Sequence, residues 1–245
     1  MTEVENGNQE MKNEAPQQRK ARRRTWQRGA TVTARDVEIV AWLARVRFAS
    51  CQQVQQRFGV SASKTYERLR GRCCDGLVQR HRVMHNLPSV YTATRNGLRL
   101  VRSPLPLASV SAQGFAHDLA VVDLMVRLEW SGHRVLTERE FRYCERRSRA
   151  SYSVDLGLVR GRPAAHRPDL ILTDDAGRHT AIELELSAKG ADRLGEILRA
   201  YRRAQHLAGV TYFVPTLRDV VRIEGVGVQL GLGERLRVMT IASLG

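Results

Sequence analysis

Two strand-like runs joined by a short turn constrain this chain more than any other feature. The first run is the apolar segment 170–172, which directly follows Pro168 and Asp169. Residues 174–177 (Asp-Asp-Ala-Gly) are typical of a turn, and an alternating run, 180–187, comes next. This pattern predicts an antiparallel hairpin with Asp169 at the start of one strand.

The second strand of this hairpin carries paired acids. Side chains two residues apart in a strand share a face, so Glu183 and Glu185 should lie opposite Ile182 and Leu184. Asp169 on the neighbouring strand would then approach Glu183. Three carboxylates on adjacent strands have the oxygen ligands that Mg²⁺ prefers, with Mn²⁺ as a substitute. The alternative is that these acids form an ordinary solvent-facing strand surface.

The charge of the chain points to a polyanion partner. The formal net charge is +15 over 245 residues, and the excess is concentrated early in the sequence. Residues 16–30 carry +6 and residues 31–103 carry +9, whereas the much longer segment 104–245 carries only +3. We therefore expect nucleic-acid contacts within the first hundred residues.

Cysteine spacing and hydropathy exclude several classes of protein. The four cysteines lack metal-ligand spacing and are typical of reduced thiols. No stretch approaches the roughly 20 apolar residues of a membrane-spanning helix, and the polar N-terminus does not resemble a signal peptide. The sequence predicts a soluble, cytoplasmic protein with no membrane partner.

Composition divides the chain into four segments. Residues 1–30 lack apolar periodicity and predict a disordered basic arm, which either touches phosphates or only aids solubility. Residues 31–103 predict a winged helix-turn-helix, with a first helix that opens after the Thr33/Asp36 capping box and further helices near 50–58 and 62–75. Residues 104–112 predict a linker, and residues 113–245 a second domain.

The third helix and the hairpin after it supply the candidate DNA contacts. Lys64, Arg68 and Arg72 recur at four-residue spacing, opposite a face expected to bury Ala62, Tyr66, Leu69 and Cys73. Arg80 and Arg82 fall in the predicted wing. This pattern predicts binding of double-stranded DNA, with the third helix in the major groove. The alternative is a winged helix used for protein contacts.

The second domain predicts the element order α-β-β-β-α-β. A helix is expected near 112–131 and a strand over 134–143, where Glu138 and Glu140 are weaker ligand candidates. The 168–187 hairpin follows, then a helix near 191–208 and a strand at 210–214. A last strand is expected at 236–242. The chain as a whole therefore predicts a mixed α/β (α+β) fold.

This order, with Pro-Asp on one strand and Glu-x-Glu on the next, resembles the core of the PD-(D/E)xK nuclease superfamily. Together with the N-terminal winged helix, the chain resembles the replication-relaxation family of bacterial plasmids and mobile elements over residues 33–215. The resemblance implies a role in plasmid DNA relaxation, replication or mobilisation, with replication or mobilisation proteins as partners. A homodimer stays an open alternative. The resemblance also implies that Asp169 and Glu183 bind metal, and it suggests a histidine at the position of His117.

One position departs from the superfamily pattern. Glu185 stands where most members have a catalytic lysine that positions water and offsets transition-state charge. Glutamate could serve as a base or third metal ligand, but it supplies no positive charge. Lys189, four residues later, is the candidate replacement. Two hypotheses follow: a non-catalytic DNA-binding accessory protein, or a Mg²⁺-dependent nickase or endonuclease that uses Asp169, Glu183 and Glu185.

Overall fold

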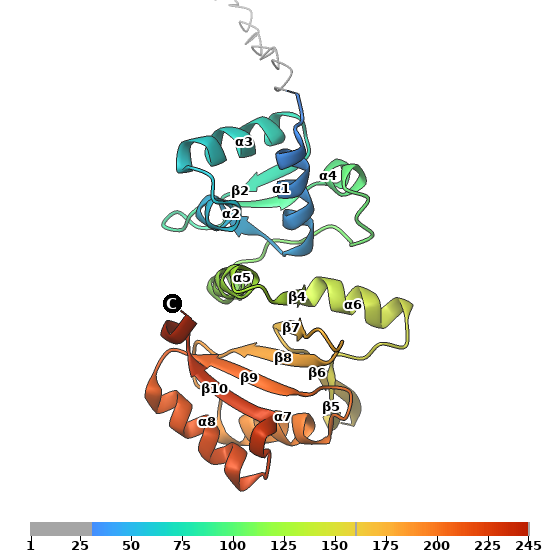
Figure 1. Ribbon diagram of the computed structural model, residues 1–245, viewed down its shortest axis with the longest axis vertical. Helices are drawn as coiled ribbons and strands as arrows, with labels where there is room; N and C mark the ends of the chain where they lie inside the picture. The colour runs from blue at the N-terminus through green and yellow to red at the C-terminus, as the bar shows by residue number, and fades with distance from the viewer. Residues whose placement is uncertain (1–30, 160, 245) are drawn as a thin grey trace, which may run out of the picture.

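The computed structural model describes residues 31–159 and 161–244, so the predicted basic arm lies outside the described residues. The described chain is a mixed α/β fold of the α+β type with separate sheets (Figure 1). The elements of its first part, in chain order, are α1 (Ala34–Arg45), β1 (Ala49–Ser50), α2 (Cys51–Phe58), α3 (Ala62–Cys74), β2 (Val78–His81), β3 (Val90–Ala93) and α4 (Arg95–Leu100). β1, β3 and β2 form an antiparallel sheet in that order.

Local signals explain where these first helices begin and end. Thr33 caps α1 in a capping box with Asp36, as the sequence predicts, and Ser50 does the same for α2 with Gln53. Gly59 ends α2 at φ 61°, in the left-handed region that favours glycine. Gly97 in α4 is required for another reason, because an added Cβ would lie 2.2 Å from the Leu77 carbonyl oxygen. The absence of a side chain at Gly97 therefore lets α4 pack closely against Leu77, the residue before β2.

The second part is built around a five-stranded sheet. Its strands run in the order β10-β9-β8-β7-β4, with β8, β9 and β10 parallel and β7 antiparallel to both β8 and β4. The elements of this part, in chain order, are α5 (Phe115–Trp130), β4 (Arg134–Thr137), α6 (Glu138–Arg147), β5 (Val154–Val159), β6 (Arg162–His166), β7 (Leu170–Thr173), β8 (His179–Leu184), α7 (Ala191–Arg203), β9 (Gly209–Val214), α8 (Leu217–Gln229), η1 (Gly233–Arg235), β10 (Leu236–Thr240) and η2 (Ile241–Leu244).

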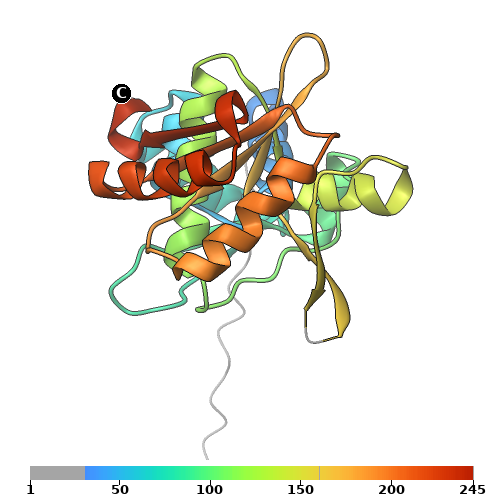
Figure 2. The same ribbon diagram turned by 90° about the horizontal axis from the view of Figure 1, so that it is seen from below.

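The two faces of the five-stranded sheet are covered by different helices. α5 lies between the sheet and the first part of the molecule, whereas α7 lies on the opposite face (Figures 1 and 2). Ile182 and Leu184 share a buried cluster with α5, and Ala181 and Tyr212 share another with α7. The alternation of β8 across the sheet therefore follows the predicted pattern.

The strand predicted over 134–143 is wrong after residue 137. Only Arg134–Thr137 forms a strand, and α6 begins at Glu138. Thr137 caps this helix in a capping box with Glu140, which removes Glu138 and Glu140 from the sheet. The predicted order α-β-β-β-α-β is found in α5, β4, β7, β8, α7 and β9, but α6 and the β5–β6 hairpin interrupt it. α8 and β10 follow it.

The two parts of the chain share one hydrophobic core. Trp42 and Val54 from the first part lie in the same buried cluster as Val122, Met125 and Ile182 from the second. Residues 104–112 connect the parts without forming a helix or strand.

Polar contacts reinforce this junction. Glu129 of α5 accepts hydrogen bonds from Trp42, Arg45 and Arg57. The side chain of Thr137 also donates to the Arg45 carbonyl oxygen at 2.7 Å. In the part of the chain that the structure describes, no helix is long and apolar enough to cross a membrane.

Candidate functional site

The predicted carboxylates lie where α5, the loop after β8, and the helices α7 and α8 meet the sheet. Glu183 and Glu185 are 2% and 3% exposed, so they do not form a solvent-facing strand surface. Glu183 lies opposite Tyr212 in the parallel pairing of β8 with β9. Glu185 follows the last residue of β8, but its backbone N–H still donates to the Phe213 carbonyl. The sheet therefore fixes the backbone of both acids.

Glu183 is held by two side chains that reach it from different elements. His166 at the end of β6 places Nε2 2.6 Å from Glu183 Oε1, and the Tyr201 hydroxyl of α7 donates to the same oxygen. Burial and the neighbouring Glu183 charge both raise the pKa of Tyr201. Tyr201 therefore stays a hydrogen-bond donor to the buried carboxylate.

Glu185 forms ion pairs with two cations. Lys189 Nζ lies 3.0 Å from Oε2, and Arg222 of α8 lies 2.6 Å from Oε1. Burial alone would raise the pKa of Glu185, but the hydrogen bonds from Arg222 and Lys189 hold it below its usual value. Lys189 thus reaches Glu185 from the loop after β8, although the strand does not continue as far as residue 189.

Asp169 is oriented by the backbone of the next strand. Its Oδ2 accepts a hydrogen bond of 2.7 Å from the Leu184 N–H. His117 Nε2, from α5, lies 3.0 Å from the Leu184 carbonyl oxygen and 3.5 Å from Asp169 Oδ2. The hydrogen bond to Asp169 is the main cause that raises the pKa of His117 to about 9. His117 is therefore a cation at neutral pH, and Asp169 has a positive partner.

One hydroxyl near these acids is unsatisfied. The Tyr212 hydroxyl is buried and lacks a hydrogen-bond partner within the described residues. Burial raises the pKa of Tyr212, and the charges of Glu183, Glu185 and Asp169 raise it further. Tyr212 therefore contributes a neutral phenol to the cluster.

The arrangement of these residues does not fit a Mg²⁺ centre. Carboxylate oxygens are suitable ligands for a hard cation, but here each acid is already oriented by its own protein partners. Across residues 31–159 and 161–244, no group of three His, Cys, Asp or Glu side chains is placed to hold a metal ion. A divalent cation at Glu185 would have to compete with Lys189 and Arg222, which already contact the two carboxylate oxygens.

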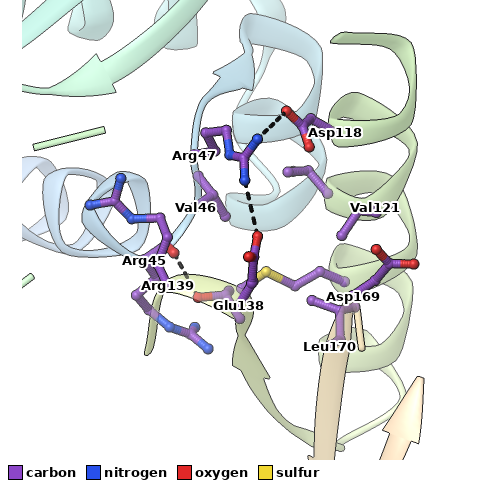
Figure 3. Close-up of a pocket in the computed structure, with 12 residues that line it drawn as sticks. Arg45, Val46, Arg47, Asp118, Val121, Glu138, Arg139, Asp169 and Leu170 are labelled. Carbon is purple, nitrogen blue, oxygen red and sulfur yellow. Dashed lines mark hydrogen bonds and ion pairs between the residues drawn. The ribbon is translucent and has the colours of Figure 1, made fainter. Parts of the chain in front are cut away.

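Asp169 also lines a small cavity at the junction of the two parts. Its volume is about 50 Å³, and in its lining Arg47 pairs with Asp118 at 3.2 Å and with Glu138 at 3.0 Å (Figure 3). Glu140 instead pairs with Arg45 at 2.7 Å. Glu138 and Glu140, which were candidate ligands on a strand, therefore serve the junction between the two parts.

The predicted DNA-binding residues divide into exposed and buried sets. Lys64, Arg80 and Arg82 are exposed, and Arg80 donates to the Ser89 hydroxyl. Arg68 is half-buried and pairs with Asp36 at 3.0 Å. Arg72 is only 3% exposed, which contradicts its predicted place on the open face of α3.

The inner face of α3 also differs from the prediction. Arg72 lies 3.1 Å from Asp75 and 3.7 Å from Asp36, so it anchors α3 to α1. Tyr66, expected inside, is 46% exposed, and Thr65 is buried in its place. Arg70, which does not belong to the predicted four-residue series, is exposed on α3.

Sequence reasoning missed several residues of the carboxylate cluster. Tyr201 carried a partial signal because it lies on the apolar face of α7. His166 and Arg222 carried no such signal in the sequence, since each reaches its acid only through the tertiary fold.

No protein-family model, curated protein or solved structure matches this chain.

Proposed function

We propose that this protein binds double-stranded DNA as a non-catalytic accessory factor of a bacterial plasmid or mobile element. It would act in DNA relaxation, replication or mobilisation, with replication or mobilisation proteins as its partners. The order of α1, α2 and α3, followed by the β2–β3 hairpin, supports assignment of the first part as a winged helix. In that assignment α3 is the helix that enters the major groove.

The observation that carries the proposal is the group of exposed cations on α3 and β2. Lys64 and Arg70 are exposed on α3, and Arg80 and Arg82 are exposed on and just after β2. α3, which carries part of this surface, is held against α1 because the buried Arg72 and the half-buried Arg68 both pair with Asp36 of α1. A helix that is held in place and carries exposed cations suits phosphate and base contacts.

The carboxylate cluster supports a structural role for the second part. Glu185 lies between two cations, Glu183 is hydrogen bonded to His166 and Tyr201, and Asp169 bonds the backbone of β8. These contacts tie α7, α8 and the loop after β8 to the sheet. The nickase alternative would require them to be broken, so we favour the non-catalytic function.

The DNA-binding surface is tested by replacing Lys64, Arg70 and Arg82 with Gln together. The slope of log K against log salt for a duplex of about 40 base pairs should flatten by roughly 2–3 units, because each phosphate contact contributes about 0.9. The matched control replaces Arg199, Arg218 and Arg237, exposed arginines of α7, α8 and β10, and should retain the parent slope. Equal slopes in the parent and in the Lys64/Arg70/Arg82 variant would contradict the proposal.

The same preparation tests the non-catalytic assignment. Supercoiled plasmid should stay intact with the parent protein in the presence of either Mg²⁺ or Mn²⁺. Metal-dependent nicking that disappears in Asp169→Ala would overturn the assignment and restore the endonuclease alternative.

A further inference from the structure

A second basic surface lies away from α3, where the segment 103–109 crosses between α4 and α6. On the α6 side this segment closes a cleft of about 270 Å³. The cleft is lined by four arginines and a single acid: Arg47, Arg139, Arg142, Arg146 and Glu138. We name this the arginine cleft.

Glu138, the single acid that the described residues contribute to the arginine cleft, already pairs with two of its arginines. Glu138 pairs with Arg47 at 3.0 Å and with Arg142 at 3.2 Å. Arg139 and Arg146 therefore bring positive charge that no acid lining the cleft offsets. Excess guanidinium charge in a concave site favours an anionic ligand.

Arg139 is the most constrained cation in the cleft. Its guanidinium donates to the Pro106 carbonyl oxygen, and its Nε is buried without a hydrogen-bond partner among the described residues. Burial lowers the pKa of Arg139, and the neighbouring Arg47 charge lowers it further. A phosphate near this guanidinium would offset both effects and add to the smaller contribution of Glu140, because its negative charge favours the charged form of Arg139.

The basic surface continues across the segment 103–109 onto α4. A second hollow, of about 590 Å³, shares Pro106 and Leu107 with the arginine cleft and is lined by Arg95, Arg99 and Arg102. These three side chains are exposed, and among the described residues no acid lines this hollow. α4 and α6 lie on the same side of the molecule, with α6 below α4 in Figure 1. The two hollows thus form one continuous basic track.

We propose that this track, from α4 across Pro106 to the arginine cleft, binds the phosphodiester backbone of DNA outside the stretch that α3 contacts. This inference rests on the proposed DNA-binding function and extends the contact surface to the second part of the chain. All seven cations of the track are arginines, whose planar guanidinium groups match phosphate oxygens in a bidentate geometry. Phosphate contacts of this kind fix register and orientation without reading sequence.

The junction keeps the track in a fixed position relative to α3. Arg47 lies on the wall of the arginine cleft and also pairs with Asp118 of α5. Arg45 ties α1 to Glu129 of α5 and to Glu140 of α6. Both basic surfaces therefore belong to one unit, so the distance between α3 and the track along a bound DNA duplex should be constant.

The test replaces Arg95, Arg99 and Arg146, three exposed arginines of the track, with Gln. On a duplex of about 40 base pairs the salt slope should flatten by roughly 2–3 units, and the hydroxyl-radical footprint should shorten on one side only. The Arg199/Arg218/Arg237 control removes the same charge elsewhere and should keep the parent slope and footprint. Unchanged melting temperatures would show that the track variant is folded.

The outcomes separate this inference from the proposed function. A track variant with the parent slope and footprint, alongside a Lys64/Arg70/Arg82 variant that loses affinity, would overturn the inference alone. A parent protein that binds no DNA would overturn both. Binding of poly-glutamate that depends on the track, with DNA binding unaffected, would also overturn the inference, because the partner would then be an acidic polypeptide.

Discussion

At the scale of single residues, the third helix shows how far a spacing rule can be trusted. Lys64, Arg68 and Arg72 recur every four residues, and this spacing predicts that all three lie on one face. Each step of four residues rotates about 40° around the helix axis, so two steps rotate about 80°. Lys64 is accordingly exposed, Arg68 half-buried and Arg72 buried against Asp75. Two helical residues that are four positions apart therefore lie on nearly the same face, whereas two that are eight positions apart can differ in burial.

For the carboxylates, the sequence predicts the face of the strand on which they lie but not the side chains that contact them. The two-residue period of a strand correctly placed Glu183 and Glu185 together, opposite Ile182 and Leu184. Their partners could not be predicted in the same way. Arg222 lies 37 residues after Glu185, on a helix whose docking no local pattern specifies.

His117 gives a test of this cluster by its pH dependence. The pKa of His117 in the folded protein is about 9, above its unfolded value of 6.5, chiefly because of the hydrogen bond with Asp169. The stability that this contact supplies is therefore fully present below about pH 6.5 and is lost as pH rises through about 9. The free energy of unfolding of the parent should exceed that of His117→Gln by more at about pH 6 than at about pH 10.

Urea denaturation at the two pH values measures this difference, and NMR titration of the imidazole gives the pKa directly. The comparison between parent and variant cancels other groups that titrate in the same range. A gap that is constant with pH, or an imidazole that titrates near 6.5, would contradict the paired arrangement of His117 and Asp169.

At the scale of elements, the clearest error is the strand expected over 134–143. The sequence carried a helix-start signal at this point, because Thr137 and Glu140 have the spacing of a capping box. Thr33 with Asp36 is a similar signal, and there the helix start was predicted correctly.

The cap of α6 should contribute more to stability than an ordinary helix cap. Thr137 accepts from the Glu140 N–H and also donates to the Arg45 carbonyl, whereas Thr216 of α8 caps its own helix at an exposed site. Thr137→Ala should cost about 1–2 kcal/mol for the cap and about 1 kcal/mol more for the lost bond. Thr216→Ala should cost only the cap and an exposed hydrogen bond to Asp219 within the same turn, with no contact to the other part of the chain. Chemical denaturation of both variants measures the difference, and equal losses would refute a structural link through Thr137.

At the scale of the whole molecule, the sequence predicted a division that the packing does not respect. Composition suggested separate domains joined by a linker at 104–112, since Pro104, Pro106 and serines cluster there. The structure instead places Trp42 of α1 in one cluster with Met125 of α5. Contacts between residues some eighty positions apart leave no periodic trace in a sequence, so composition alone could not reveal them.

This shared core should make the two parts unfold together. Fluorescence of Trp42, which lies at the junction, and far-UV circular dichroism of the whole chain should follow one coincident transition in urea. Trp42→Phe is the control that identifies the junction signal among the three tryptophans. Two separate transitions, with the tryptophan signal changing in only one, would show that the parts are thermodynamically independent.

The ion pairs of Arg45 and Arg47 have a further consequence for how this chain can change over generations. A protein whose two parts make few specific contacts with each other can exchange one part by recombination and keep the other. Here a replacement for residues 31–103 would need to bring matching groups for Glu129, Asp118 and Glu138 at once. We therefore expect the two parts to be inherited as a pair. Under the proposed function, a new DNA preference would then arise more readily through substitutions on the exposed face of α3 than through exchange of the whole first part.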